Sequence, residues 1–274
     1  MMRSLFSAVS GLRVHQTRMD VIGDNIANVN TVGFKRSTVT FKDIFYQTLR
    51  GGAASTEFMG GTNPQQVGLG VALDNIQVVH GQGPAQPTGS GTDLMIQGDG
   101  FFRVSPDDGT IIYYTRAGAF HFDNEGYLVN GDGFNVLDTA GQPIQITDMA
   151  SPDTLPQSFN IDSLGVVHYV DYQGNLQTAG TISIARFSNP AGLEKVGQNL
   201  YAASASSGPP SSDVTPGQGS LASTTIIPSA LEMSNVDLAQ EFTDMIITER
   251  GFQANARTIT ISDEMLQELV NLKR

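Results

Sequence analysis

The chain of 274 residues contains no cysteine and no tryptophan. Without cysteine, disulfide bonds, thiolate catalysis and cysteine-ligated zinc are excluded, while the redox compartment is left open. Basic residues are also scarce, since 15 Lys and Arg stand against 27 Asp and Glu, for a formal net charge of −12. This balance disfavours nucleic acid as a partner. No apolar run reaches the ~18 residues of a transmembrane helix, so membrane insertion is not predicted.

The start of the chain also lacks the pattern of a secretory signal. Its apolar stretch is short, mixed with Ser and Gly, and interrupted by Arg13 and His15. A cleaved signal needs a longer apolar region. We therefore expect a cytoplasmic protein, unless the chain leaves the cell by a route that does not read a cleaved signal.

Patterns that would indicate catalysis or cofactor binding are missing as well. The four histidines are scattered with no two at metal-ligand spacing, and neither a Gly-x-Ser-x-Gly elbow nor a P-loop occurs. Gly68-Leu69-Gly70 lacks the third glycine of a dinucleotide site, and Asp123–Gly126 with Asp132-Gly133 is better explained by hairpin turns than by a calcium loop. The sequence predicts no catalytic, cofactor-binding or metal-binding residues and no enzyme.

Long helical segments are predicted at both ends of the chain. The first runs from an N-cap at Ser4 to about Val29, and the second from a capping box at Ser234–Asp237 to Leu272, with Lys273 and Arg274 at its dipole end. In both, apolar residues recur at alternating spacings of three and four, which places them along one side of a helix. These two apolar seams consist of Leu5, Val9, Leu12, Met19 and Ile26, and of Leu238, Phe242, Met245, Phe252, Ala256, Ile259, Leu266 and Val270.

Most apolar stripes of this kind pack on their own domain. Here each stripe is separated from the rest of the chain by a flexible stretch. The two helices could meet only as one antiparallel pair, and each would keep one face open. Because two helices alone bury little surface, we predict that the seams are self-assembly surfaces covered by further copies of the chain.

The region between the helices is rich in glycine and favours strands. Val32–Phe41 is predicted as a strand, Lys42–Leu49 as one or two helical turns, and 51–91 as a loop in which Val67–Val79 could pair. Turn residues then separate short apolar runs in the manner of β-hairpins. The predicted strands there are Leu94–Ile96, Phe101–Val104, Ile111–Thr115, Tyr127–Val129, Phe134–Leu137, Ile144–Ile146, Val166–Tyr169 and Thr181–Phe187.

The predicted fold class is therefore α+β. N- and C-terminal helices would pair as a coiled-coil-like inner domain, joined by extended linkers to a central all-β domain. The expected boundaries are 1–30 and 234–274 for the helical assembly domain, 31–91 for a linker with short strands, 92–201 for the all-β domain, and 202–233 for a linker and return segment.

Several segments resemble the bacterial flagellar rod and hook proteins. They stand in the same order along the chain, at both ends and through much of the middle, which makes the combination more specific than any one match. The segments are Ala27–Lys35 after the first helix, Thr92–Phe102 at the entry to the β region, Tyr114–Gly118 with Phe120, and the tail from Ser234–Asp237 through Arg250–Ala256 to Leu272.

This resemblance implies an axial protein of the flagellum that self-assembles into a helical polymer. In the family the two terminal helices form an inner coiled-coil layer around a central channel, with β domains outside. The resemblance also implies export through the flagellar type III apparatus without a cleaved signal, and neighbours among the other axial proteins, namely rod, hook cap and hook–filament junction. The location would be the extracellular hook or the basal body.

Two members of the family fit the length of this chain. Gly251–Asn255 and Gly60–Gly70 resemble hook proteins, so we favour a hook subunit, a flexible joint that transmits torque from rod to filament. The alternative is a distal rod subunit, which forms a rigid drive shaft. A secreted carbohydrate-binding β module or enzyme is a remote alternative, which rests on the hairpin-rich middle and on aromatics expected to be exposed, namely Tyr113, Tyr114, Tyr169 and Tyr172.

Overall fold

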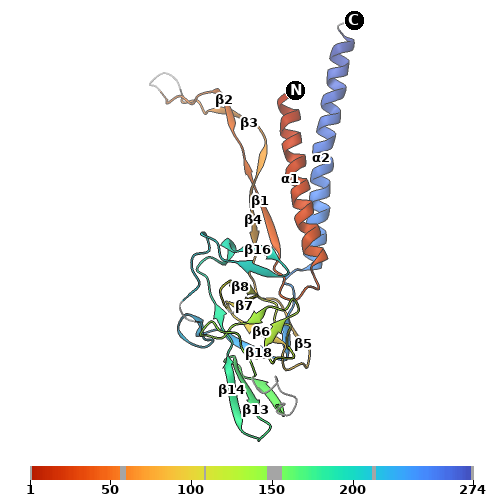
Figure 1. Cartoon of the computed structure of the whole chain (residues 1–274). Helices are drawn as coiled ribbons and strands as arrows, with labels where there is room; N and C mark the ends of the chain where they lie inside the picture. The colour runs from red at the N-terminus through yellow and green to blue at the C-terminus, as the bar shows by residue number, and fades with distance from the viewer. Residues whose placement is uncertain (1, 56–59, 108, 147–155, 212–213, 273–274) are drawn as a thin grey trace. The chain divides into compact units, whose positions relative to one another are not determined.

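The computed structural model of the chain describes residues 2–55, 60–107, 109–146, 156–211 and 214–272. Two long helices, α1 (Met2–Ala27) and α2 (Leu238–Asn271), stand at its ends and are drawn red and blue in Figure 1. Between them the described chain forms β-strands and two short 3-10 helices, η2 (Pro190–Gly192) and η3 (Gly219–Leu221). Terminal helices that pack together around a β-rich middle confirm the predicted α+β class.

Contacts divide the chain into two compact units, which we call the helical unit and the β unit. The helical unit consists of Met1–Ala27, Ser37–Val78 and Asp237–Arg274. The β unit consists of Asn28–Arg36 and Val79–Val236. The chain therefore passes from one unit to the other four times, and the helical unit is made from three separate stretches of sequence.

The helical unit contains the helix pair and two antiparallel hairpins (Figure 1). One hairpin pairs β1 (Ser37–Asp43) with β4 (Val71–Val78), and the other pairs β2 (Tyr46–Arg50) with β3 (Gln65–Gly68). The turn from β3 into β4 contains Gly70 at φ +126°, a conformation that L side chains rarely adopt. Hydrogen-bonded ladders thus occupy most of the described part of 37–78.

Several sequence-based predictions for this region were wrong in detail. The strand expected at 32–41 begins only at Ser37, and the helical turns expected at 42–49 are replaced by the end of β1 and by β2. Tyr46–Arg50 is exposed along its whole length, so it offers no apolar helical face, and pairing with β3 satisfies its backbone instead. Within the loop expected over 51–91, the stretch Val67–Val79 does pair, mainly as β4, while β3 and β5 (Ala85–Pro87) are further strands that were not expected.

The helix ends also differ from those expected. The N-cap of α2 is Asp237, whose side chain accepts hydrogen bonds from the backbone amides of Ala239 and Gln240. Ser234, the expected start of a capping box, lies three residues before this cap. At the other end of the chain, α1 begins at Met2 and ends at Ala27. Ser4, the expected N-cap, therefore lies inside the helix. The predicted basic end of α2 lies outside the described residues.

The main sheet of the β unit is built from short antiparallel strands in the order β16-β17-β8-β7-β11-β10-β9, with β15 paired to β7. A three-stranded sheet β12-β13-β14 and two pairs, β18-β6 and β19-β5, accompany it. The strands are β6 (Leu94–Gln97), β7 (Phe101–Ser105), β8 (Tyr113–Thr115), β9 (Phe120–Phe122), β10 (Leu128–Asn130), β11 (Asn135–Val136), β12 (Ser158–Ile161), β13 (Val166–Val170), β14 (Leu176–Thr181), β15 (Ile184–Ala185), β16 (Glu194–Gly197), β17 (Leu200–Ala202), β18 (Thr225–Pro228) and β19 (Ala230–Glu232).

Two apolar clusters form the core of the β unit. The larger one includes Leu94, Phe102, Ile182 and Ile184, none of which is exposed. The Phe102 and Phe120 rings meet edge to face with their centroids 5.2 Å apart, an arrangement that aromatic pairs prefer. Burial alternates along strands such as β13, where Val167 and Tyr169 are buried and the other face is partly exposed.

Two further differences concern the β unit. The run expected as a strand at 144–146 forms only isolated bridges through Pro143 and Gln145. Segment 202–233, expected to be a linker and return segment, contains η3, β18 and β19, and its Leu221 is completely buried. The segment has the Ser-, Pro- and Gly-rich composition of a linker, but its later residues form strands that pair with β5 and β6.

Neither described helix combines the length and apolarity needed to cross a lipid bilayer. Within the same residues, no three His, Asp or Glu side chains gather in a way that would hold a metal ion.

Candidate assembly surface

The two helices pack antiparallel through small and polar residues. Gly11 lies against Asn255, and a Cβ atom at Gly11 would be 2.6 Å from the Asn255 Nδ2 atom. One turn further along α1, His15 lies against Gly251, where an added Cβ would be 2.7 Å from the imidazole Cε1 atom. The glycines therefore permit a close approach that larger residues would prevent. Their cost in helix propensity is offset by this packing.

Polar bonds continue the same interface toward the other end of the pair. Arg18 forms an ion pair with Asp244 at 2.9 Å. Asn25, which is buried, donates to Glu241 at 3.2 Å and exchanges two hydrogen bonds of 2.9 Å with the backbone of Ser37 at the start of β1. Asn25 thus joins α1 to both α2 and the hairpin, and each of its buried polar atoms has a partner.

None of these contacts involves a residue of the predicted apolar seams. The contact side of α2 contains Glu241, Thr248, Asn255 and Ser262, spaced by sevens. These residues were not predicted because they are not apolar, although their heptad spacing is visible in the sequence. The seams lie beside the interface, where they remain partly or largely accessible. Val9, Leu238, Phe242, Phe252 and Val270 are exposed, and Leu5, Leu12, Met19, Ile26, Met245, Ala256, Ile259 and Leu266 are half-buried.

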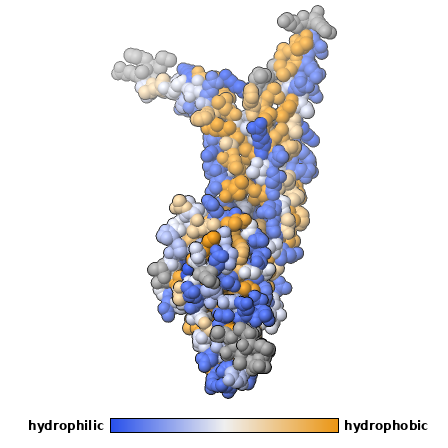
Figure 2. Space-filling view, viewed as in Figure 1, coloured by the Kyte–Doolittle hydropathy of each residue, from blue (hydrophilic) through white to orange (hydrophobic). Residues whose placement is uncertain are grey.

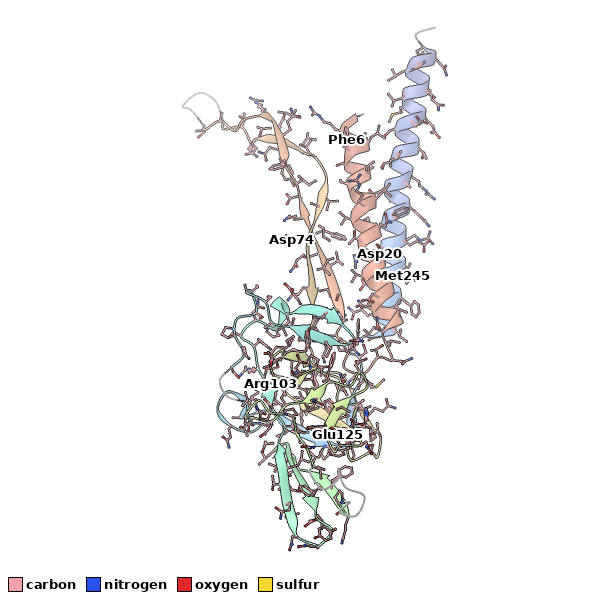
Figure 3. The ribbon with its side chains drawn as sticks, viewed as in Figure 1. Phe6, Asp20, Asp74, Arg103, Glu125 and Met245 are labelled. Atoms are coloured by element: carbon pink, nitrogen blue, oxygen red, sulfur yellow. The ribbon has the colours of Figure 1, made fainter. Side chains whose placement is uncertain are left out.

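Further apolar side chains widen the exposed surface of the helical unit. On α1, Phe6 is 67 % exposed and projects from the helix in Figure 3, where Met245 of α2 is also labelled. In Figure 2 apolar side chains, coloured orange, gather over the helices and the hairpin strands. The other large exposed apolar residues of this unit are Ile44, Phe45, Tyr46, Leu49, Val67, Leu69, Leu73, Ile76, Ile246, Ile247, Ile261, Met265, Leu269 and Leu272. Contiguous exposed apolar surface of this kind indicates an interaction site.

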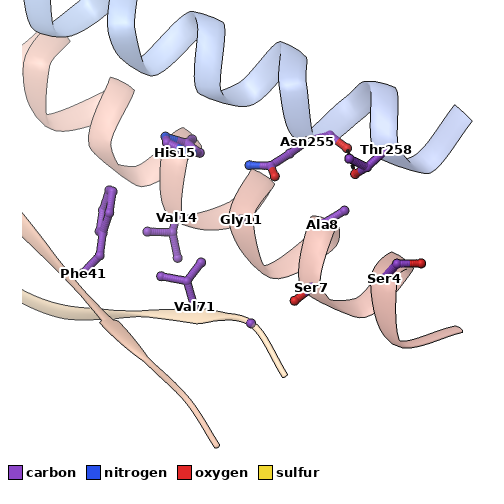
Figure 4. A pocket seen from close by; sticks show the side chains of 11 residues that line it. Ser4, Ser7, Ala8, Gly11, Val14, His15, Phe41, Val71, Asn255 and Thr258 are labelled. Carbon is purple, nitrogen blue, oxygen red and sulfur yellow. Dashed lines mark hydrogen bonds between the residues drawn. The ribbon is translucent and has the colours of Figure 1, made fainter. Parts of the chain in front are cut away.

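A groove lies inside the helical unit where the β1–β4 hairpin approaches the helices. Its volume is about 460 Å³, and Figure 4 shows Val14, Phe41 and Val71 lining one side of it, with Ser7 and Asn255 nearby. The Ser10 hydroxyl accepts a hydrogen bond of 3.3 Å from the Val71 amide, which holds the hairpin beside α1.

His15 is the titratable residue of this groove. Its ring meets that of Phe41 edge to face at 5.8 Å. Burial, and to a smaller degree the charge of Arg18, lower the pKa of His15 below its usual value. Around it the groove offers apolar groups, hydroxyls and an amide. It therefore suits packing against another surface, and it holds no pair of acid and base groups that would indicate catalysis.

The β unit contains a buried cluster of charges. Glu232 lies between two cations, accepting from Lys35 at 2.5 Å and from Arg116 at 3.1 Å, and all three side chains are almost inaccessible. Burial lowers the pKa of Lys35, although the charge of Glu232 opposes this effect. Gly33, two residues before Lys35, adopts φ +70° and would bring a Cβ to 2.5 Å from the Ala117 amide nitrogen. Two segments singled out in the sequence, 27–35 and 114–118, therefore meet in the fold.

Three family profiles match the chain in the order of these structural parts. "Flagella basal body rod protein" matches residues 5–35, which contain most of α1. "Flagellar hook protein FlgE/F/G D1 domain" matches residues 95–169 of the β unit. "Flagellar basal body rod FlgEFG protein C-terminal" matches residues 227–272, which contain α2.

Individual relatives extend these matches to the full length. The chain is 52% identical to the flagellar basal-body rod protein FlgG of Bacillus subtilis, with all of both chains covered. It is 37% identical to FlgG of Borreliella burgdorferi over 276 positions, and 30% identical to the flagellar hook protein FlgE of the same organism over 447 positions, again with all of both chains covered. The chain therefore belongs to the FlgE/F/G family of flagellar hook and basal-body rod proteins.

Proposed function

We propose that this chain is the subunit of the distal flagellar rod, a rigid tubular shaft built from many copies. The observation that carries the proposal is its identity with FlgG along the whole chain, 52% with the protein of B. subtilis. Within B. burgdorferi the rod protein is also more similar than the hook protein, at 37% against 30%. The comparisons therefore favour the rod alternative over the hook subunit that we predicted.

The residues that suggested a hook have another explanation. Gly251, part of the hook-like segment, lies against His15, so its small size is explained by packing between the helices. Gly61, in the other segment, approaches the backbone of Ala53 and Ser55, where a Cβ would be 3.1 Å from a carbonyl oxygen. Short segments with local packing reasons carry less weight than identity along the entire chain.

The exposed apolar surface of the helical unit supports self-assembly. Phe242 and Phe252 are 50 % and 41 % exposed on α2, although phenylalanine gains about 1.5–3 kcal/mol from full burial. Other copies of the chain would cover these side chains. Contacts between different surfaces of identical subunits generate open helical polymers, as a shaft requires.

The paired hairpins support a stiff shaft. A β-ladder joins Ser37–Asp43 to Val71–Val78, and a second ladder joins Tyr46–Arg50 to Gln65–Gly68. Hydrogen bonds between strands resist bending better than the loop that we expected there. The exposed Phe45 and Leu49 of this region offer further contacts to neighbouring copies.

The rest of the proposed role follows from the family. The chain would meet other axial proteins, namely the rest of the rod and the hook with its cap and junction proteins. It would reach the basal body through the flagellar export apparatus without a cleaved signal, and it would catalyse no reaction. Residues 1–30 and 234–274 would act as the assembly domain, with the two seams as its contact surfaces.

Polymerisation tests the assembly part of the proposal. Replacing Phe242 and Met245 by Asp places charges on the C-terminal seam, and we expect the soluble chain to keep a folded β unit but to form no polymer. Leu176→Asp is the matched control, because it charges an apolar residue that is 70 % exposed in the β unit. Normal polymers from the double variant would contradict the proposed seam.

Electron microscopy of the wild-type polymer tests the choice between rod and hook. A rod subunit should give straight polymers with a central channel, whereas a hook subunit should give curved ones. Curved, flexible polymers would restore the hook hypothesis.

A further inference from the structure

His80 lies beside the buried charge cluster of the β unit, in the segment that follows β4. The carbonyl of its neighbour Gly81 accepts a hydrogen bond of 2.7 Å from Lys35 Nζ. On its other side, the Val79 amide donates to the Arg36 carbonyl at 2.9 Å. Backbone contacts on both sides therefore hold His80 next to a buried cation.

The imidazole ring of His80 packs against two aromatic residues of the main sheet. Phe101 on β7 and Tyr201 on β17 meet it edge to face, with centroid distances of 5.4 and 5.7 Å. Both aromatic residues are only 3 % exposed. The guanidinium carbon of Arg116 lies 5.4 Å from the centre of the Phe101 ring. The imidazole thus has apolar neighbours and a second buried cation close by.

Among the described residues, no carboxylate pairs with His80. Both imidazole nitrogens are buried, and neither makes a well-formed hydrogen bond within this part of the chain. The buried carboxylate of the cluster, that of Glu232, already accepts from Lys35 and Arg116. A proton on His80 would therefore add a positive charge where one carboxylate serves two cations, and a buried charge without a partner is unfavourable.

Positive side chains act on His80 from three segments. Arg116 follows β8, Lys35 precedes β1, and Lys195 lies on β16. Burial, followed by the charges of Arg116 and Lys35, lowers the pKa of His80 to about 4. The Pro190 carbonyl acts in the opposite direction but more weakly than either of these charges, and Lys195 adds a still smaller lowering effect. The imidazole is therefore neutral at pH 7.

Further ionisable side chains lie around the ring. Asp99 and Arg186 line the same cavity of about 210 Å³ as His80, and they lie 3.6 Å from each other. Their side chains are 78 % and 45 % exposed, so water screens both charges. Burial raises the pKa of Tyr201 to about 12, so its hydroxyl carries no charge in acid. The buried cations thus dominate the field at His80.

We propose that His80 is an acid-sensitive switch of the β unit. Uptake of one proton by the imidazole places a further positive charge beside Lys35 and Arg116, whose shared carboxylate has no charge to spare. The charged ring regains hydration only by leaving Phe101 and Tyr201. Acid therefore detaches the segment that carries His80 from β7 and β17 and loosens the β unit.

The pH range of the switch follows from the two states of the ring. In the unfolded chain the pKa of His80 has its ordinary value of 6.5, and in the folded β unit it is about 4. Because the folded state binds the proton more weakly, the closed contact stabilises fully above pH 6.5, and this stabilisation is lost as the pH falls from 6.5 toward 4. The difference corresponds to a rise of about 100-fold in the unfolding equilibrium constant between pH 7 and pH 4.

The biological setting of the switch rests on the proposed function, whereas the switch itself is a property of the β unit. Subunits of a rod outside the cytoplasm would meet the external pH, and acid would loosen their β units. A hook subunit with the same β unit would respond in the same way. Failure of the polymer to form straight shafts would therefore leave the switch intact.

Urea unfolding of the full-length protein at pH 7, 5.5 and 4 tests the switch. The near-ultraviolet signal of the tyrosines follows the β unit. His80→Phe keeps an aromatic ring against Phe101 and Tyr201 but removes both nitrogens. Between pH 7 and pH 4 we expect the unfolding equilibrium constant of the wild type to rise about 100-fold more than that of the variant. A difference of about tenfold or more supports the switch, and a smaller one overturns it.

The matched control is His121, an exposed histidine on β9 of the same unit. His121→Phe should keep the pH dependence of the wild type, and an effect equal to that of His80→Phe would contradict the proposal. A second measurement needs no variant. In NMR spectra of the wild type, the imidazole signal of His80, assigned through the backbone, should remain that of a neutral ring down to about pH 5. Protonation with a midpoint near pH 6.5 would overturn the proposal even if His80→Phe failed to fold.

Discussion

At the scale of single residues, Glu232 joins segments that are far apart in the sequence. Its partners Lys35 and Arg116 are 197 and 116 positions away, and each lies in a segment that resembles flagellar proteins. A buried ion pair adds little net stability, because desolvation offsets much of the attraction. Loss of one partner, in contrast, leaves a buried charge without compensation. The main contribution of Glu232 is therefore to specify which segments of the chain come together in the β unit.

Glu232→Gln should accordingly destabilise the β unit strongly. The amide keeps the shape of the side chain but leaves Lys35 and Arg116 without a counter-charge, which typically costs about 3 kcal/mol or more. The free energy of unfolding in urea, followed by the near-ultraviolet signal of the tyrosines, measures the effect. Asp74→Asn, in an exposed pair, should change stability by less than about 1 kcal/mol. Equal effects of the two substitutions would show that the buried cluster has no special importance.

Two members of this cluster lie in segments that could be singled out from the sequence, but their role as buried charge partners was not predicted. Lys35 and Arg116 lie in segments that resemble flagellar rod and hook proteins, but Glu232 was assigned to a return segment. Ion pairs between distant positions leave no periodic pattern, and composition gives no sign of which carboxylate will be buried. Burial of the cluster is a property of the fold and became visible only in the structure.

At the scale of elements, the two helices separate their polar and apolar contacts. One side of each helix meets the other through Gly11, Asn255 and similar small or polar residues, while seam residues such as Phe242 and Phe252 remain exposed. This division explains how the helices can pair within one chain and still present an apolar surface. Polar interfaces of this kind also give a defined register, since each donor has to meet its acceptor.

Matched substitutions in α1 test the close approach of the helices. Gly23→Ala has no atom within 4 Å of the added Cβ, so it should stabilise the chain by about 0.5–1 kcal/mol through helix propensity. Gly11→Ala gains the same propensity but forces the Asn255 amide aside (Figure 4). We expect it to be less stable than Gly23→Ala by at least about 1 kcal/mol, a typical penalty for overpacking. Thermal unfolding followed by helical circular dichroism compares them, and equal stabilisation would contradict the observed interface.

The helices were predictable from sequence, and the strands around them less so. Spacings of three and four persist over many residues, which gives the helices a strong signal. β1 has seven residues and β2 has five, which is too short to give a comparable periodic signal. Glycine-rich stretches also resemble loops in sequence, whether or not their backbones pair in strands. On the contact side of the helix pair, Gly11 and Gly251 are small residues of the kind that lets helices approach closely, whereas the polar contact residues of α2 give no apolar signal.

At the scale of the whole molecule, the two units differ in how they are stabilised. The buried apolar residues of the described helical unit are Ala8, Val14 and Ile22, whereas the β unit has an extensive core. Since burial of apolar surface is the main stabilising contribution, the helical unit of an isolated chain should be much the weaker. Assembly would supply the burial that a single copy lacks.

We therefore expect two separate transitions when the monomer is unfolded in urea. Both α-helices belong to the helical unit, so circular dichroism at 222 nm should be lost first. Most tyrosines, including the buried Tyr114 and Tyr201, belong to the β unit, so the near-ultraviolet signal should persist to higher urea. Polymerisation should move the first transition upward. Coincident transitions in the monomer would show instead that the units unfold as one.

The composition of the helical unit also constrains the order of folding during synthesis. Residues of α1 find their partners in α2, as between Asn25 and Glu241, which are 216 positions apart. A ribosome releases the N-terminus first, so α1 remains unpaired until nearly the whole chain has been made, while the β unit is able to fold earlier. For most of its time on the ribosome, the nascent chain thus presents its N-terminal apolar seam without α2, and only the β1–β4 hairpin is available to contact α1.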